Sequence, residues 1–294
     1  MKYVFFGSPR FAAIILEELI ENNTPPLAVI ASPDRPTGRK QLITPPDTKI
    51  LCLKYNIPIH QPEKLTQSEL APLAQEVDFF LVAAYAKIIP LSVLNLPRLG
   101  TIGIHPSPLP KFRGASPIQS TILTGTPEAG VSLYLMDAAV DHGPVLRTTL
   151  LDTYKPDAWN YQTLEKALAE LGAQTFSQVM PDYLAGKLQP TPQDEFQTSM
   201  TKKFKTADAK IEEVNLETAL RGENIETTRS VLRKILAFSR EPGAWTILKK
   251  NLQVGKNILP ASLRIKILDA ELKDSRLVLK LVHIEGRKPQ VVEA

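Results

Sequence analysis

Apolar positions along the first two thirds of the chain follow two alternating patterns. Short continuous apolar runs, typical of strands buried on both faces of a sheet, occupy residues 2–6, 27–31, 79–83 and 101–104, and further strands are expected at 130–135 and 145–151. Apolar residues at helical spacing occur at 11–21, 48–55, 66–75, 116–124 and 161–184. Strands that alternate with amphipathic helices predict a doubly wound, Rossmann-like α/β domain with a parallel sheet. The turn after the first strand lacks the G-x-G-x-x-G spacing, so no dinucleotide site is expected.

The pattern changes after the long helix. Residues 189–205 contain Pro190, Pro192 and several polar residues, which predict a linker. The remaining residues then carry one amphipathic helix and several alternating strands, expected at 226–238, 244–249, 263–272 and 277–284. The sequence therefore predicts a first domain over residues 1–188, a linker over 189–205 and a smaller β-rich domain over 206–294.

Charge is unevenly distributed along the chain. The 294 residues have a net charge of +4, but residues 201–294 hold 19 Lys and Arg against 12 Asp and Glu, whereas residues 1–200 hold 16 against 19. A basic domain beside an acidic one fits the binding of a polyanion such as nucleic acid. A basic surface that only contacts solvent fits these counts equally well.

Composition narrows the function classes further. No uninterrupted apolar run approaches the roughly 20 residues that span a bilayer, and the apolar run at the N-terminus is too short for a signal peptide. We therefore expect a cytoplasmic protein with no membrane partner. The single cysteine, Cys52, excludes an internal disulfide, and no His/Cys cluster has the spacing of a zinc site, so no metal is expected.

The stretch from Gly100 to Leu146 concentrates the candidate chemistry. His105 ends an apolar run, and the three prolines that follow it exclude both helix and regular strand pairing. Asp141 lies in the turn after the next expected strand. Because loops at the carboxyl ends of strands converge in an open α/β sheet, we expect His105 and Asp141 to meet. A His beside an Asp is general acid–base machinery. Isolated His and Asp residues on loops are, however, usually solvated surface groups.

The order of motifs in this stretch resembles the signature of the 10-formyltetrahydrofolate-dependent formyltransferases. The motifs are His105-x-Ser107-x-Leu109-Pro110-Lys111-x-Arg113-Gly114-x-x-Pro117-Ile118, then Met136-Asp137, then Asp141-x-Gly143-Pro144. The start, Gly7-Ser8-Pro9-x-Phe11-Ala12, is similar to the Gly-Thr-Pro-x-Phe-Ala of the members that act on tRNA. Within the family, the chain is most similar to those members.

The resemblance implies transfer of a formyl group from 10-formyltetrahydrofolate, the co-substrate, to the amino group of methionyl initiator tRNA, for translation initiation. It implies that His105 stabilises the oxyanion of the reaction and that Asp141 supports the histidine and helps to take the proton. Residues 1–188 would then form the folate-binding catalytic domain and residues 206–294 an OB-like tRNA-binding domain. We expect the protein to act as a monomer.

The resemblance also assigns binding residues. Those implied to contact folate are Tyr85, Ala86, Ile88, Ile89, Ser107, Pro108, Leu109 and Pro110. Those implied to contact tRNA are basic, and they lie in the long segment after the second strand or in the linker: Arg35, Arg39, Lys40, Lys202, Lys203 and Lys205.

One position departs from the family pattern. Family members carry Asn-x-His at the end of this strand, and Gly103 stands where the asparagine is expected. An asparagine would supply an amide donor to the formyl oxygen, and losing one such donor costs on the order of 100-fold in turnover. We therefore expect a slow enzyme in which Gly103→Asn raises turnover, unless a neighbour already fills the role.

Two other functions fit the same residues. The acceptor could be a sugar-nucleotide amine or a glycinamide ribotide amine, although a small acceptor requires no basic second domain. Alternatively, Gly103 and the basic domain together fit a catalytically weak relative that binds RNA.

Overall fold

The computed structural model describes residues 1–38, 41–240 and 242–292. The chain divides into two compact units. The first comprises Met1–Gly114, Gly130–Leu151 and Glu165–Met200, and the second comprises Ala115–Ala129, Asp152–Leu164 and Thr201–Ala294. Each unit is therefore assembled from segments that are far apart in the sequence.

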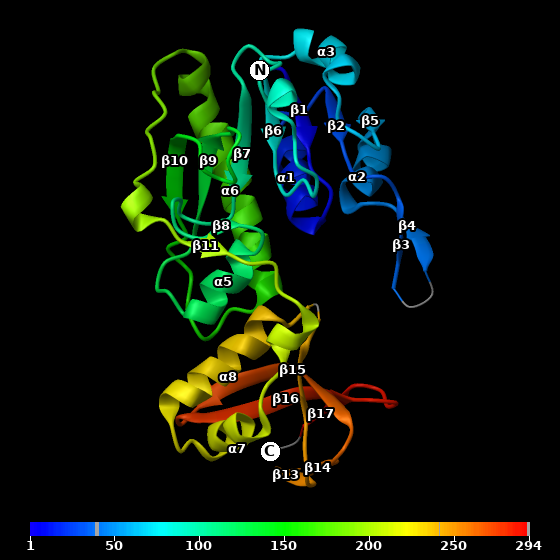
Figure 1. Ribbon diagram of the computed structural model, residues 1–294, viewed down its shortest axis with the longest axis vertical. Helices are drawn as coiled ribbons and strands as arrows, with labels where there is room; N and C mark the ends of the chain where they lie inside the picture. The colour runs from blue at the N-terminus through cyan, green and yellow to red at the C-terminus, as the bar shows by residue number, and fades with distance from the viewer. Residues whose placement is uncertain (39–40, 241, 293–294) are drawn as a thin grey trace. The chain divides into compact units, whose positions relative to one another are not determined.

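The first unit is built on one seven-stranded sheet, of order β10-β9-β7-β6-β1-β2-β5 (Figure 1). The strands are β1 (Tyr3–Phe6), β2 (Ala28–Ile30), β5 (Ile59–His60), β6 (Phe79–Val82), β7 (Thr101–His105), β9 (Gly130–Leu135) and β10 (Val145–Leu150). β5, β2, β1, β6 and β7 are parallel, as expected. The expectation of a wholly parallel sheet is wrong at one edge, because β9 runs antiparallel to β7 and β10 antiparallel to β9.

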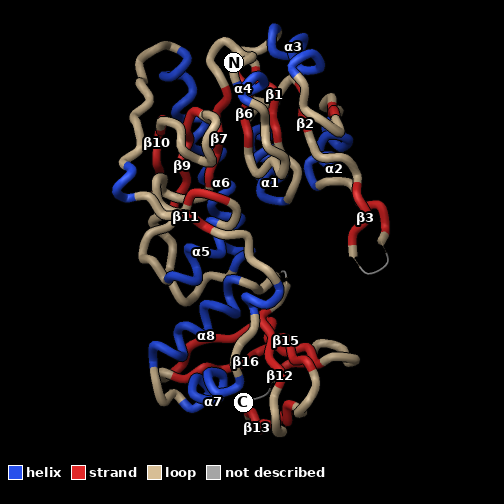
Figure 2. The backbone as a smooth tube through the Cα atoms, viewed as in Figure 1, coloured by secondary structure: helices blue, strands red, loops and turns tan. Residues whose placement is uncertain are grey.

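Helices cover both faces of this sheet, because its central strands are apolar on both sides (Figure 2). On one face, Tyr3 and Phe79 stack at 5.4 Å between ring centroids, and Phe176 of α6 (Tyr161–Leu184) packs on both. α1 (Arg10–Glu21) buries its apolar side on the same sheet. On the other face, Val4 and Phe6 lie in one apolar cluster with residues of α3 (Gln67–Gln75) and α4 (Leu91–Leu94). α2 (Asp47–Tyr55) contacts α1.

The long segment after β2 contains a two-stranded ribbon that projects from the sheet (Figure 1). β3 (Arg35–Thr37) pairs antiparallel with β4 (Leu42–Thr44), and both strands are exposed. At its base, Asp34 accepts hydrogen bonds from the Lys49 ammonium at 2.8 and 2.9 Å and from Gln61 at 2.7 Å. The Lys49 ammonium holds the pKa of the Asp34 carboxyl below its usual range.

The second unit contains an antiparallel sheet of order β12-β15-β16-β17 and a separate hairpin of two short strands. Its strands are β12 (Ala244–Ile247), β13 (Leu252–Val254), β14 (Asn257–Leu259), β15 (Arg264–Lys273), β16 (Arg276–Ile284) and β17 (Gln290–Val291). Its helices are α5 (Pro117–Thr124), η2 (Thr206–Ala209), α7 (Glu213–Arg221) and α8 (Ile225–Ala237). The sequence pattern did not predict α7, β13, β14 or β17.

Helix α5 belongs to the second unit although it lies within residues 1–188 of the sequence. It packs on α8, and the Arg233 guanidinium of α8 donates to both oxygens of Asp157 and to the Thr124 carbonyl. A side chain at Gly125 would overlap this guanidinium. Removing residues 206–294 would therefore strip α5 of its partner, so the expected boundary at 188 is not a boundary between compact units.

Residues 189–205, expected to be a linker, are largely packed into the first unit instead. Residues up to Met200 belong to the first unit, and they contain η1 (Glu195–Gln197). The Arg113 amide donates to the Ser199 carbonyl at 2.9 Å, next to the short ribbon of β8 (Arg113–Gly114) and β11 (Met200–Thr201). Among the described residues, no helix is both long enough and apolar enough to cross a membrane.

Candidate active site

His105 is the last residue of β7, and the residue is buried, with 6% of its surface exposed. Its Nε2 lies 2.9 Å from the Phe112 carbonyl oxygen. A carbonyl oxygen only accepts, so Nε2 carries the hydrogen and donates it. The bond fixes the plane of the ring and leaves Nδ1 as the nitrogen that can gain or lose a proton.

Asp141 faces that nitrogen, with its Oδ2 3.6 Å from His105 Nδ1. His105 and Asp141 meet, as expected. They do not meet for the expected reason, which was that both residues follow the carboxyl ends of parallel strands. β9 runs antiparallel to β7, so the loop after β9 begins at the opposite end of β7 from His105, where the Met136 amide bonds to the Thr101 carbonyl. The loop must fold back along the sheet to bring Asp141 to the histidine.

Three groups hold the Asp141 side chain and backbone in place. Oδ1 accepts the Tyr134 hydroxyl at 2.7 Å, and Oδ2 accepts the Gly114 amide at 2.8 Å. The backbone of Asp141 is in the left-handed region, with φ +50°, which costs a non-glycine residue energy unless its surroundings fix it. The Gln193 amide donates to the carbonyls of both Asp141 (3.0 Å) and Gly143 (2.8 Å) and so fixes that turn.

Gln193 in turn accepts hydrogen bonds from Arg113, which is 4% exposed. Arg113 also donates to both oxygens of Glu195, at 3.0 and 2.7 Å. The Arg113 guanidinium holds the pKa of the Glu195 carboxyl below its usual range. Gln193 and Glu195 were not predicted as site residues, because a polar stretch after two prolines gives no signal that it folds back on a loop fifty residues earlier.

Tyr134 was also not predicted. It lies directly opposite Gly103 on the neighbouring strand, and it is buried. A Cβ on Gly103 would stand 2.6 Å from the ring carbon Cζ and 2.9 Å from the hydroxyl oxygen. The space where a side chain at position 103 would begin is therefore filled by the tyrosine ring, which counts against the expectation that Gly103→Asn raises turnover.

The residues expected to contact folate separate into exposed and buried groups. Ala86 and Ile88 are exposed, and Tyr85 and Pro110 are partly buried. Ile89 and Tyr85 pack with the apolar cluster on the sheet face that α3 and α4 cover. Ser107, Pro108 and Leu109 are buried, and the Ser107 hydroxyl donates to the Lys111 carbonyl at 2.6 Å.

The basic residues expected to contact tRNA are exposed where the structure describes them. These are Arg35 on β3 and Lys202, Lys203 and Lys205. Lys202 forms an ion pair with Asp208 at 2.5 Å. Arg39 and Lys40 lie outside the described residues.

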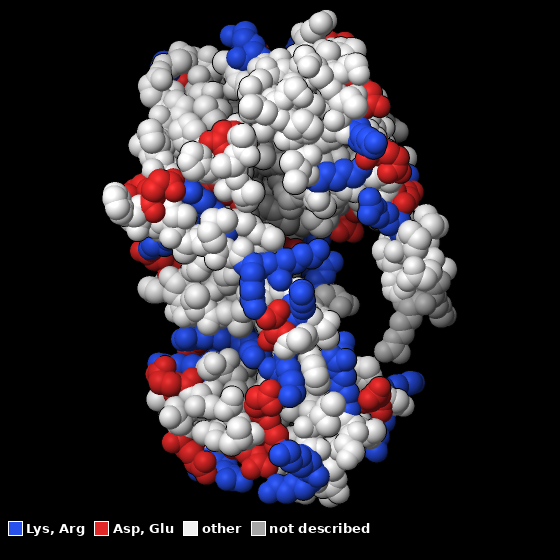
Figure 3. Space-filling model, in the orientation of Figure 1, with Lys and Arg blue, Asp and Glu red and all other residues white. Residues whose placement is uncertain are grey.

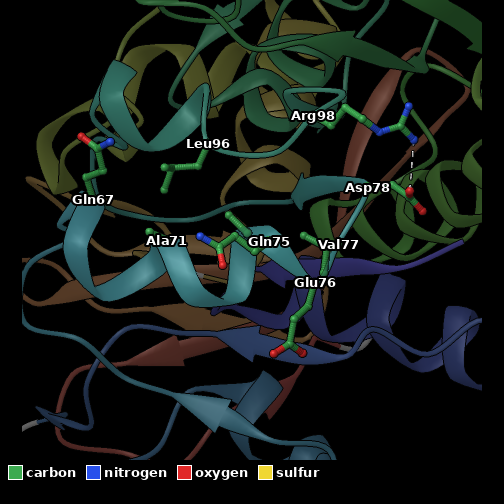
Figure 4. Close-up of a pocket in the computed structure, with 9 residues that line it drawn as sticks. Gln67, Ala71, Gln75, Glu76, Val77, Asp78, Leu96 and Arg98 are labelled. Carbon is green, nitrogen blue, oxygen red and sulfur yellow. Dashed lines mark hydrogen bonds and ion pairs between the residues drawn. The ribbon is translucent and has the colours of Figure 1, made fainter.

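A surface cavity of about 610 Å³ lies away from these residues (Figure 4). It is lined by α3 and by residues that precede β6 and β7, among them Asp78 and Arg98, which form an ion pair at 3.3 Å. His105 stands at the carboxyl end of β7, so this cavity is at the opposite end of that strand. Among the described residues, no group of three or more His, Cys, Asp or Glu side chains could hold a metal ion.

Comparison with known proteins defines the class to which this fold and site belong. The family model described as formyl transferase matches residues 1–180. The chain is therefore a member of the formyl transferase family, a family of enzymes. It is 33% identical over 279 residues to the methionyl-tRNA formyltransferase of Staphylococcus aureus (strain MW2), a match that covers 94% of this chain and 81% of the relative.

Solved structures share the fold. Methionyl-tRNA formyltransferase from Clostridium thermocellum has a TM-score of 0.60 at 17% identity and matches 97% of this chain and 98% of its own. HypX from Aquifex aeolicus, solved in complex with tetrahydrofolic acid, has a TM-score of 0.61 at 16% identity. That match covers 92% of this chain but only 38% of the larger HypX chain.

Proposed function

We propose that this protein transfers a formyl group from 10-formyltetrahydrofolate to the amino group of methionyl initiator tRNA. The observation that carries the proposal is the extent of the similarity to the Staphylococcus aureus enzyme. It spans 94% of the chain and so includes the second unit as well as the segment matched by the family model. The name of that relative specifies methionyl-tRNA as the acceptor.

His105 and Asp141 would carry the proton chemistry. The His105 ring is fixed through Nε2, and its Nδ1 faces the Asp141 carboxylate, so an imidazolium formed during the reaction is stabilised by a nearby negative charge. Both side chains are largely buried, which strengthens that interaction relative to water. The pair can therefore accept a proton from the amine and hold a positive charge near the carbonyl that gains negative charge.

Two observations fit a folate near the segment that follows β6. The backbone amides of residues 85–88 form no hydrogen bond to any described residue, and the hydroxyl of Tyr85 is buried without a partner among them. Buried polar groups normally have partners, so the Tyr85 hydroxyl suits the polar edge of a bound heterocycle, and the unpaired amides are open to the same edge. Tyr85, Ala86, Ile88 and Ile89 would line one side, and the 107–110 segment another. The folate, when bound, supplies the formyl group.

The second unit would bind the tRNA. Figure 3 shows many lysine and arginine side chains, with acidic ones among them, on the face of this unit in view. We propose that its antiparallel strands form an OB-like nucleic-acid module and that Lys202, Lys203 and Lys205, with Arg35, Arg39 and Lys40 of the ribbon segment, contact phosphates. Phosphate contacts release counterions, so the affinity for tRNA should fall steeply with salt.

The test is transfer of labelled formyl from 10-formyltetrahydrofolate to a panel of acceptors. The panel contains methionyl initiator tRNA, methionyl elongator tRNA, a sugar-nucleotide amine and glycinamide ribotide. We expect label on the initiator tRNA with a clear preference over the elongator. Label only on a small amine would replace the acceptor in the proposal, and tRNA binding without transfer to any acceptor would indicate a silent relative.

A further inference from the structure

Strand pairing places Tyr134 and His105 on one face of the sheet. Gly103 and His105 are two residues apart on β7 and therefore point to the same side. Tyr134 is paired with Gly103 in the register of β7 and β9, so its ring extends over the glycine on that same side. An aromatic ring over a cross-strand glycine packs well only because the glycine has no side chain.

The hydroxyl of Tyr134 is directed to the carboxylate that faces His105. It donates to Asp141 Oδ1 at 2.7 Å, while Oδ2 of the same carboxylate lies 3.6 Å from His105 Nδ1. Burial and the Asp141 charge raise the pKa of Tyr134 well above its ordinary value, so the phenol remains a donor at neutral pH. Tyr134 therefore fixes the position of Oδ1 of Asp141. Because the carboxylate is rigid, this also limits where Oδ2 lies relative to His105.

We propose that Tyr134 is a positioning residue of the active site and that Gly103 and Tyr134 are a matched pair. In this pair the glycine provides room for the ring, and the phenol holds Asp141 towards His105. Gly103 then leaves no gap in the site where the family has an asparagine, because the Tyr134 ring from the neighbouring strand fills the space that the asparagine side chain would occupy. This inference rests on the proposed formyl transfer for its kinetic tests, but not for its stability test.

The first test removes only the hydroxyl. We expect Tyr134→Phe to lower kcat roughly tenfold with little change in the KM for folate or tRNA, because misplacing a catalytic group costs turnover rather than binding. The matched control is Tyr3→Phe. Tyr3 is equally buried in the same sheet, and its hydroxyl donates to the Thr24 carbonyl at 2.6 Å, away from the site. It should lower stability but leave kcat unchanged.

The second test exchanges the two partners. In the wild-type background, Gly103→Asn must displace the Tyr134 ring, so we expect kcat to fall. In a Tyr134→Ala background the space is open and the asparagine amide can reach towards the site, so the same substitution should raise kcat. A change of sign between the two backgrounds is specific to a matched pair. Equal effects of Gly103→Asn in both backgrounds would overturn the pairing.

The third test needs no activity. Asp141→Gly removes the carboxylate and suits the positive φ at that position. We expect Tyr134→Phe to lower the melting temperature by about 2–4 °C in the wild type and by much less in Asp141→Gly. Equal losses would contradict the link between Tyr134 and Asp141. If the wild type transfers no formyl group to any acceptor, the proposed function fails, and this cycle still decides whether Tyr134 positions Asp141.

Discussion

The stretch around the candidate site contains two His–Asp pairs, and they differ in an instructive way. His142 Nδ1 lies 2.6 Å from Asp137 Oδ2, and both side chains are exposed, at 47% and 37%. His105 and Asp141 are farther apart, at 3.6 Å, but only 7% and 16% of their side chains are exposed. The shorter contact is therefore the one that faces water.

Distance alone would select His142 and Asp137 rather than the pair that we propose to be catalytic. An exposed ion pair is screened by solvent, so its contribution is small. His105 is fixed by the Phe112 carbonyl, and Asp141 by Tyr134, Gly114 and Gln193. A general acid–base group must be held in position before the reaction, and the bonds to His105 and Asp141 meet that requirement in a buried setting. The predictions below test this comparison.

Removing either member of the buried pair should have the largest effect. We expect His105→Ala and Asp141→Asn each to lower kcat by about 100-fold or more, the usual contribution of general acid–base catalysis. Affinity for tRNA should stay near wild type, because neither residue is among the lysines and arginines proposed to contact phosphates. Formyl transfer and filter binding, measured on the same preparations, check both statements. Wild-type turnover in both variants would place the chemistry elsewhere.

Loosening the turn that carries Asp141 should have an intermediate effect. Gln193→Ala leaves the Asp141 and Gly143 carbonyls and the Arg113 guanidinium without one partner each. We expect kcat to fall roughly tenfold and stability to fall by about 1–3 kcal/mol, the cost of leaving partly buried polar groups unpaired. Gln189→Ala is the matched control, because Gln189 is exposed and its amide donates to the nearby Gly186 carbonyl, away from the turn that carries Asp141. If both variants behave alike, the turn does not depend on Gln193.

Changing the exposed pair should have little effect. We expect His142→Ala to keep kcat within about twofold of the wild type, since an exposed ion pair contributes little. The comparison with His105→Ala, measured in one experiment, is the direct test of burial against distance. A loss as large as that of His105→Ala would reverse the assignment of the two histidines.

The smallest effect concerns Glu195, which lies 3.7 Å from His142 Nε2 and pairs with Arg113. Because Arg113 lowers the pKa of Glu195 in the folded state, the ionised carboxylate stabilises the fold above its unfolded pKa. That contribution is lost as the pH falls through the lowered folded value. The wild type should therefore melt slightly above Glu195→Gln at pH 7, and the difference should vanish in strong acid. A difference in melting temperature that grows as the pH falls would contradict the prediction.

Local pattern predicted most elements of the first unit. The apolar runs became β1, β2, β6 and β7, and the helical spacing became α1, α2, α3 and α6, within a few residues of the expected bounds. These elements are encoded locally, because a strand buried on both faces and an amphipathic helix each need a particular spacing of apolar residues. The position of His105 at a strand end follows from the same local signals. The motifs around it were sufficient to indicate the family, to which the comparisons also assign the chain.

The partners of that histidine were decided only by the tertiary structure. β9 pairs antiparallel with β7. The residues of β9 would suit a parallel strand equally well, so the sequence alone does not indicate the direction of this strand. Three contacts of this kind join segments separated by tens of residues or more. They are the contact of Asp141 with His105, the hydrogen bonds from Gln193 to the turn of Asp141, and the packing of α5 on α8. The role of Gly103 is the sharpest case. The sequence identifies a missing side chain, and only the register of β7 against β9 brings the Tyr134 ring into its place, because cross-strand contacts are set by pairing rather than by neighbours along the chain.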